Sequence, residues 1–144
     1  MNKIISKEQF SEKVFKLEIE APLIAKSRRA GHFVIVRVDE KGERMPLTIA
    51  GSDLNKGTIT LVVQTVGLSS TKLCNLNEGD YVLDVVGPLG QATHIQNYGT
   101  VVCAGGGVGV APMLPIIQAL KAAGNRVISV LAGRSKDLII LENE

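Results

Sequence analysis

A glycine-rich stretch between two apolar runs carries the clearest chemical signal in this sequence. It reads VVCAGGGVGVAPMLPI over residues 101–116 and has glycines at positions 105, 106, 107 and 109. If the first run is a strand and the second a helix, backbone N–H groups and the helix dipole at the turn attract an anion. The glycines would let a pyrophosphate approach the backbone closely. The alternative is a tight turn between strand and helix that binds no ligand.

The spacing in this loop departs from two standard nucleotide motifs. The Lys-Ser/Thr pair of a P-loop is missing, which argues against ATP hydrolysis. A standard dinucleotide fingerprint needs glycine three residues after Gly107 or Gly109. Those positions hold Val110 and Pro112. The loop is therefore neither a P-loop nor a standard Rossmann loop.

Two further stretches, GERMPLTIAG and VGLSSTKL, combine polar side chains with glycine. Arg44 in the first is either an exposed turn residue or a cation for a phosphate. Ser70 and Thr71 in the second can cap a helix, and Gly67 before them favours a phosphate contact. His32 and His94 have no acid at metal or triad spacing, so neither is assigned a catalytic role.

The elements that must position these residues change in character near residue 100. Before it, KVFKLEIEA, HFVIVRVD and GTITLVVQ alternate with period two, and GDYVLDVVG is a more apolar strand. Turn signals rich in Gly, Asn and Asp separate these strands. This pattern predicts an antiparallel barrel or sandwich.

After residue 100 the pattern predicts a βαβ unit. TVVCA and RVISVLAG are short apolar runs, as expected of buried parallel strands. Between them, Met113, Ile116, Ile117 and Leu120 have helical spacing.

Prolines and a glycine mark the ends of that helix. Pro112 fits the first helical position and Pro115 the first turn, and Gly124 fits the stop. RSKDLIILENE then begins a second helix. Because open α/β sheets usually have five or six strands, we expect the chain to be truncated.

Composition excludes several other classes of protein. The chain has 144 residues, 16 basic and 14 acidic, so no strong basic excess points to nucleic acid. No stretch is long and apolar enough for a membrane span, and no signal peptide is evident. Cys74 and Cys103 are expected to be buried thiols in a reducing compartment. We expect a cytoplasmic protein.

The order of these motifs resembles the ferredoxin–NADP reductase superfamily. In that superfamily an antiparallel barrel binds flavin, and a following α/β domain binds nicotinamide through a G-x-G-[IV]-[AT]-P loop. Here GVGVAP forms residues 107–112, AGHFVIV matches a Gly-x-Phe strand, and EGDYVLDVVGPLG matches the closing strand and linker. The resemblance covers essentially the whole chain. It implies a flavin-binding barrel over residues 1–98 and the start of a nucleotide-binding α/β domain over 99–144.

The resemblance also implies roles for individual residues. RMPLTIAG matches the flavin motif R-x-[YF]-[ST], with Thr48 near the reactive edge of the ring as the catalytic residue. Leu47 replaces the usual aromatic residue, and Arg44 stands four residues before Thr48 rather than three. The implied cofactor-binding residues are Arg44, Met45, Pro46, Leu47 and Thr48, then Gly67, Ser69, Ser70 and Thr71, then Gly106, Gly107, Val108, Gly109 and Pro112, and finally Arg134.

Within the superfamily, the chain resembles the small (alpha) subunit of ferredoxin–NADP reductase, also described as sulfide dehydrogenase beta subunit. The resemblance implies FAD, NAD(P), and electron transfer to ferredoxin or a larger flavoprotein or iron–sulfur subunit. It implies a [2Fe–2S] cluster only in a longer chain, and no metal ligand here. Arg134 is either a surface residue or a contact for a ribose 2′-phosphate, so NAD and NADP both stay open. The alternatives are a dihydroorotate dehydrogenase electron-transfer subunit and a non-catalytic flavin- or nucleotide-binding module.

Overall fold

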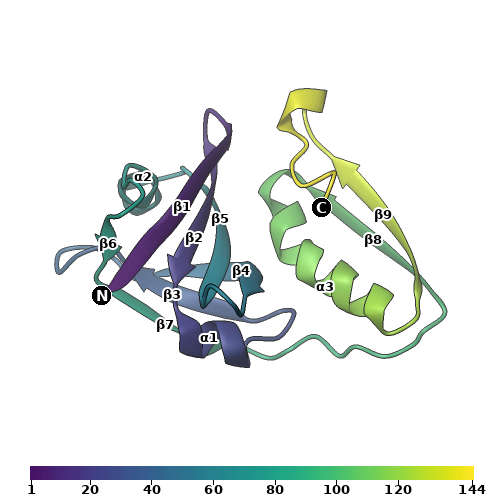
Figure 1. The fold of residues 1–144 in the computed structure, drawn as a ribbon. Helices are drawn as coiled ribbons and strands as arrows, with labels where there is room; N and C mark the ends of the chain where they lie inside the picture. The colour runs from purple at the N-terminus through teal and green to yellow at the C-terminus, as the bar shows by residue number, and fades with distance from the viewer.

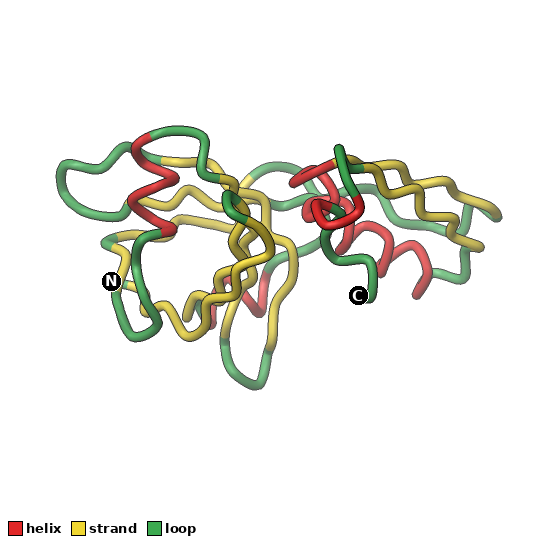
Figure 2. Tube along the Cα trace, turned by 90° about the horizontal axis from the view of Figure 1, so that it is seen from above, coloured by secondary structure: helices red, strands yellow, loops and turns green.

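The computed structural model describes all residues from 1 to 144 and has two parts side by side (Figures 1 and 2). The first is a seven-stranded antiparallel sheet with the order β6-β1-β2-β5-β4-β3-β7, curved into a barrel. The second is a parallel pair, β8 and β9, with one helix, α3. The predicted reductase-type barrel followed by an α/β unit is confirmed.

Period-two alternation sets the strands of the barrel. The long β2–β5 ladder pairs Val14 with Gln64 at one end and Glu20 with Thr58 at the other. A register shift between Ile49 and Gly51 marks a bulge on β4. The strands are β1 (Asn2–Ser11), β2 (Val14–Glu20), β3 (Phe33–Arg37), β4 (Met45–Asp53), β5 (Thr58–Gln64), β6 (Tyr81–Val82) and β7 (Asp84–Leu89).

The stretch GDYVLDVVG forms two strands rather than the single strand that was expected. β6 pairs with β1, whereas β7 pairs with β3 at the opposite edge of the sheet. Leu83 lies between them, and its N–H donates to the carbonyl of Val38. The chain therefore crosses from one edge to the other at Leu83, which brings the two edges together.

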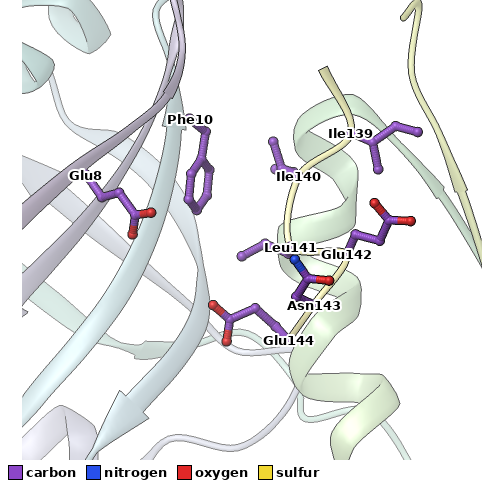
Figure 3. A pocket seen from close by; sticks show the side chains of 8 residues that line it. All are labelled: Glu8, Phe10, Ile139, Ile140, Leu141, Glu142, Asn143 and Glu144. Carbon is purple, nitrogen blue, oxygen red and sulfur yellow. The ribbon is translucent and has the colours of Figure 1, made fainter. Parts of the chain in front are cut away.

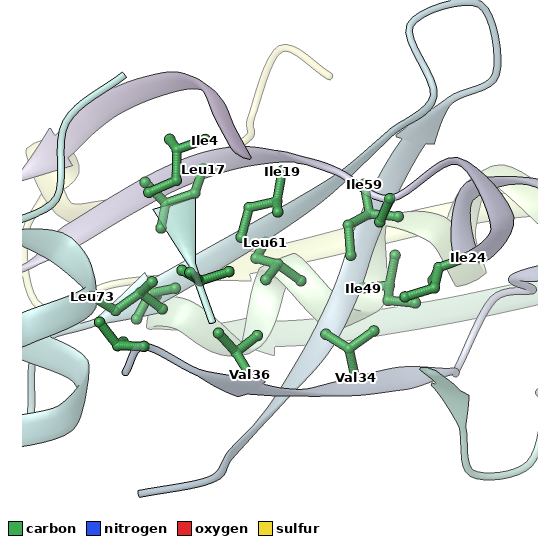
Figure 4. Packing of buried hydrophobic residues seen from close by; sticks show 14 of the residues in the cluster. Ile4, Leu17, Ile19, Ile24, Val34, Val36, Ile49, Ile59, Leu61 and Leu73 are labelled. Carbon is green, nitrogen blue, oxygen red and sulfur yellow. The ribbon is translucent and has the colours of Figure 1, made fainter. Parts of the chain in front are cut away.

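The barrel has its own apolar core of 16 buried residues (Figure 4). Inward-facing side chains such as Leu17, Ile19, Ile59 and Leu61 are completely buried. Two short helices lie against the strands, α1 (Pro22–Ser27) and α2 (Leu68–Cys74). The sequence patterns predicted neither strand β1 nor helix α1.

The βαβ unit consists of β8 (Thr100–Gly106), α3 (Val110–Ala122) and β9 (Arg126–Ala132). A single 3₁₀ turn, η1 (Gly107–Gly109), joins β8 to α3. Gly124 has a φ of +92° just after α3, as expected for a helix stop. No helix in this structure is long and apolar enough to cross a membrane.

The predicted positions of the two prolines in α3 are wrong. Because α3 begins at Val110, Pro112 is its third residue rather than its first, and Pro115 lies inside the helix. Position 112 is still in the first turn, where a missing N–H leaves no intrahelical bond unmade. Pro115 removes one such bond, and the residue is buried.

The two parallel strands are less buried than predicted. Helix α3 lies between the barrel and these strands (Figure 1), so it covers only one face of the pair. On the other face Val102 is 62% exposed, and Ile128 and Val130 are also exposed. Cys103 is half-buried rather than buried, whereas Cys74 is buried as expected.

One side chain organises the ten-residue linker, residues 90–99, that joins the two parts. The buried amide of Asn125 accepts hydrogen bonds from the N–H groups of Tyr98 and Gly99, at 2.6 and 3.1 Å. Its NH₂ group donates to the carbonyls of Gln96 and Leu120, both at 2.8 Å. The linker therefore has a fixed path although it has no regular structure.

The predicted second helix is wrong. Only one 3₁₀ turn, η2 (Lys136–Leu138), forms, and the residues after it return to the barrel. Ile140 is buried there with Ala50 and Val62 of the barrel. Ile140, with Leu141 packed beside it, faces the barrel wall, whereas Ile139 points away from the barrel (Figure 3), so the segment is extended rather than an amphipathic helix.

Candidate functional site

The first predicted site lies where β4 begins. The guanidinium of Arg44 is half-exposed and lies 3.3 Å from the carboxylate of Asp84 on β7. Neither side chain is buried, so this ion pair is a weak contact that another anion can exchange. Arg44 is therefore an available cation at the edge of the barrel.

The amino terminus of α2 lies beside this turn. The hydroxyl of Ser69 donates to the carboxylate of Glu43 at 3.1 Å. Lys72 on α2 likewise pairs with Asp39, and the hydrogen bond from Lys72 lowers the pKa of the Asp39 carboxyl below its ordinary value. The structure thus brings together the two predicted phosphate motifs, which are more than 20 residues apart in the sequence.

Ser70 has a structural role in this loop. Its hydroxyl accepts from the N–H groups of Val66 and Gly67, at 3.0 and 3.1 Å, and donates to the carbonyl of Gly67. Thr71 is exposed on the helix. The phosphate role predicted for Ser70 stays a prediction, and the free donors of this segment are the first-turn N–H groups.

Gly67 is not required by the local fold. Its φ of −162° and ψ of −174° are open to any residue. A Cβ atom built at this position would meet nothing within 4 Å. The glycine therefore leaves an open approach to the backbone at the start of α2, which fits a phosphate.

Thr48 lies on the outer face of β4. Its neighbours Leu47 and Ile49 face the barrel core, so Thr48 and Ala50 face outward. Ala50 packs against Val110 and Ala111 at the start of α3. The outer face of β4 therefore leads from the predicted flavin residue directly to the helix that follows the glycine loop. Met45 also packs against the core, whereas Pro46 is exposed.

The glycine loop combines one required glycine with others that the fold does not need. Gly107 has a φ of +56°, which disfavours side chains. Gly109 has a φ of −62°, open to any residue, and a Cβ atom there would meet nothing within 4 Å. Gly106 is also open, since a Cβ atom would lie 3.6 Å from its nearest neighbour. Val108 packs against the cluster between barrel and α3.

Arg134 lies at the same edge of the parallel pair as the glycine loop. Gly106 is in register with Ala132, the last residue of β9, and Arg134 follows two residues later. Its side chain is exposed. A cation is thus available at the carboxyl ends of the two strands. Ligands of open α/β sheets bind at this end of the strands.

The sequence patterns did not predict the acidic partners of this site. Glu43 accepts a hydrogen bond from Ser69, and Asp84 pairs with Arg44; both Ser69 and Arg44 were predicted to meet phosphate. Asp39 pairs with Lys72, which directly follows the predicted Thr71. The acidic stretch DEKGE before Arg44 could have pointed to Asp39 and Glu43, whereas no local signal marks Asp84. The three carboxylates reduce the positive potential that a diphosphate meets here.

Two cavities, of about 260 and 240 Å³, lie elsewhere, between the barrel and the C-terminal segment. Figure 3 shows Phe10 of β1 facing Ile140 and Leu141 across the first of them. Arg28 lines the second and donates to the hydroxyl of Ser52 at 2.8 Å. Neither of these two cavities includes a predicted site residue.

Comparisons with known proteins bear on this geometry. The family described as the oxidoreductase FAD-binding domain matches residues 2–94. A Thermotoga maritima protein described as a homolog of the dihydroorotate dehydrogenase B (NAD(+)) electron transfer subunit is 46% identical over all of this chain. The corresponding subunit from Streptococcus pneumoniae is 30% identical over 99% of it. The chain spans about half the length of these relatives, 51% and 57%.

Solved structures show the same fold. A structure of an NADH-dependent reduced ferredoxin–NADP oxidoreductase, studied for flavin-based electron bifurcation, superposes with a TM-score of 0.97 at 46% identity. It covers 99% of this chain, which covers 52% of that one. Phthalate dioxygenase reductase, at 23% identity, shares the fold with a TM-score of 0.80 over 96% of this chain and 45% of its own. The chain thus belongs to the oxidoreductase FAD-binding domain family, within the ferredoxin–NADP reductase superfamily.

Proposed function

We propose that this chain binds FAD along β4 and NAD(P)H at the glycine loop, and passes electrons between the nucleotide and an iron–sulfur protein. Residues 1–98 would form the flavin part of the chain and residues 99–144 the nicotinamide part. One observation carries it: Ala50, two residues after Thr48, packs against the start of α3. A flavin ring at Thr48 and a nucleotide at the glycine loop would therefore be neighbours.

The residues of the chain supply position and charge. Bound FAD supplies the redox chemistry, since a flavin takes a hydride and releases electrons singly. Arg44 and the first-turn N–H groups of α2 would face the diphosphate, and the Thr48 hydroxyl would hydrogen-bond the ring edge. Gly107 and Gly109 would let the nicotinamide nucleotide approach the backbone, and Arg134 would meet its adenosine end.

The identity of the partner is a second step in the proposal. The oxidoreductase with the TM-score of 0.97 is described as using ferredoxin, which supports an iron–sulfur acceptor. The names of the two curated relatives support a dihydroorotate dehydrogenase electron-transfer subunit as the second candidate. An assay with ferredoxin and an assay with dihydroorotate and its dehydrogenase subunit separate the two.

The test of flavin binding is the visible spectrum of the purified chain after incubation with FAD and removal of free flavin. We expect a retained flavin band that NADH or NADPH bleaches under anaerobic conditions. Arg44→Gln should weaken FAD binding about tenfold, because a charge-assisted contact to phosphate is lost. Arg126→Gln, which changes an exposed arginine at the end of the parallel pair opposite the glycine loop, is the matched control.

Each outcome of this test has a distinct meaning. Retained flavin without bleaching would support a flavin-binding module and contradict the nicotinamide part of the proposal. Absence of retained flavin in a folded chain, shown by far-ultraviolet circular dichroism, would contradict the proposal altogether.

A further inference from the structure

Two exposed apolar side chains flank Gly67 at the start of α2. Leu68 is 87% exposed, the highest value among the large apolar residues of the chain, and Val66 is 82% exposed. Single exposed apolar residues are ordinary on protein surfaces. Two of them around a glycine, beside a candidate phosphate site, form a small apolar surface at a place where polar residues would be expected.

The backbone places these two side chains on one face. Gly67 is fully extended, so its two neighbours point to the same side of the chain. Their Cα atoms are then about 7 Å apart. The hydroxyl of Ser70 holds the N–H groups of both Val66 and Gly67. This apolar ledge, Val66 and Leu68, is therefore preformed and fixed to the helix.

The ledge lies at one end of a linear series of sites. The series begins at α3, passes Ala50 and Thr48 on the outer face of β4, and reaches Arg44 where that strand begins. The hydrogen bond from Ser69 to Glu43 then joins this turn to the ledge segment. FAD has its groups in the same order, with the ring first, the diphosphate next and the adenosine last.

We infer that the Val66–Leu68 ledge is the subsite for the adenine ring of the flavin dinucleotide. This inference rests on the flavin binding proposed above. The flat face of a purine covers two aliphatic side chains and removes apolar surface from water. FMN ends at its phosphate and has no such ring. The ledge therefore makes the site prefer FAD to FMN, a specificity that Arg44 and Thr48 cannot provide because both flavins present a ring and a phosphate to them.

The experiment compares the dissociation constants of FAD and FMN, measured by quenching of flavin fluorescence, in the 144-residue chain and its variants. We expect the wild-type chain to bind FAD about tenfold or more tightly than FMN. Leu68→Ser and Val66→Ser should each weaken FAD binding about fivefold to tenfold and change FMN binding less than about twofold. Leu54→Ser, at a 70% exposed leucine at the far end of β4, is the matched control and should change neither constant.

The outcomes separate the subsite from the proposed function. If the wild-type chain binds both flavins equally well, or if the ledge variants weaken both flavins equally, flavin binding stands and the adenine subsite is overturned. If the variants leave FAD binding unchanged, the ledge has no role in flavin recognition, and a contact with another protein would explain its exposure. If the folded wild-type chain binds neither flavin, the proposed function fails, and the subsite fails with it.

Discussion

The barrel and the βαβ unit bury their apolar residues in different ways. The barrel encloses 16 buried residues that all belong to residues 1–98. The smaller cluster of five buried residues combines Ala50 and Val62 of the barrel with Val110, Ala111 and Ile140. The barrel therefore supplies its own core, whereas the βαβ unit buries its helix against the barrel wall. The flavin half is self-sufficient, and the glycine loop depends on it for position.

The largest test of this comparison is a pair of core truncations. Leu61→Ala removes a completely buried side chain from the barrel core and should destabilise the chain by about 3 kcal/mol. Val102→Ala, on the exposed face of β8, should cost about 0.5 kcal/mol or less. Urea unfolding followed by circular dichroism measures both. A larger loss in Val102→Ala than in Leu61→Ala would contradict the unequal burial.

A second test addresses the glycine loop alone. Gly107→Val puts a β-branched residue at a φ of +56°, which costs about 1–2 kcal/mol and fills the proposed phosphate approach. Titration with NADH should show binding at least tenfold weaker, while the flavin content stays at the wild-type level.

Gly109→Ala is the matched control for that strain. Its backbone accepts a side chain, so we expect unchanged unfolding and weaker NADH binding. Equal losses of flavin and NADH binding in Gly107→Val would mean that the change damages the interface with the barrel rather than the nucleotide site.

The smallest expected effect is on the pH dependence of stability, and it concerns the cysteines, one of which lies in each half of the chain. Burial raises the pKa of the Cys74 thiol to about 11, although Lys7 acts in the opposite direction. In the unfolded chain the thiol has its ordinary pKa of 9.0. The stability that the neutral, buried thiol gives the folded chain is therefore fully present below pH 9.0 and is lost as the pH rises toward 11. Between pH 8 and pH 10 the wild-type chain should lose about 1 kcal/mol more stability than Cys74→Ala.

Cys103→Ala is the control for this alkaline loss. Cys103 lies on β8 and is only half-buried. This variant also removes one thiol, so it controls for the loss of a cysteine as such. Urea midpoints at the two pH values measure all three proteins. An equal pH response in wild type and Cys74→Ala would show that the thiol is not desolvated.

Local patterns predicted most barrel strands, though not β1, and the βαβ unit, because alternation and helical spacing are properties of neighbouring residues. They failed at Leu83, where pairing with Val38 divides one apolar run into β6 and β7. They also failed for residues 134–144, because the barrel wall that receives Ile140 is distant in the sequence.

The candidate site shows the same division between local and distant information. The phosphate motifs and the glycine loop were visible as short strings, and the structure brings the first two together through Ser69 and Glu43. The apolar ledge was not predicted. An apolar residue beside a glycine becomes informative only when its exposure is known, and exposure depends on the packing of the whole chain.

The hydrogen bonds of Asn125 have a consequence for how the two halves meet. A free coil of ten residues has a root-mean-square span of about 17 Å, so halves joined by it would meet at millimolar effective concentration. The clamp fixes Gln96, Tyr98 and Gly99 to the βαβ unit, and the N–H of Thr93 donates to the carbonyl of Ala30 in the barrel, so the linker is held by both halves. An encounter between the halves then carries no further cost in translational entropy. The linker acts as a fixed arm rather than a tether.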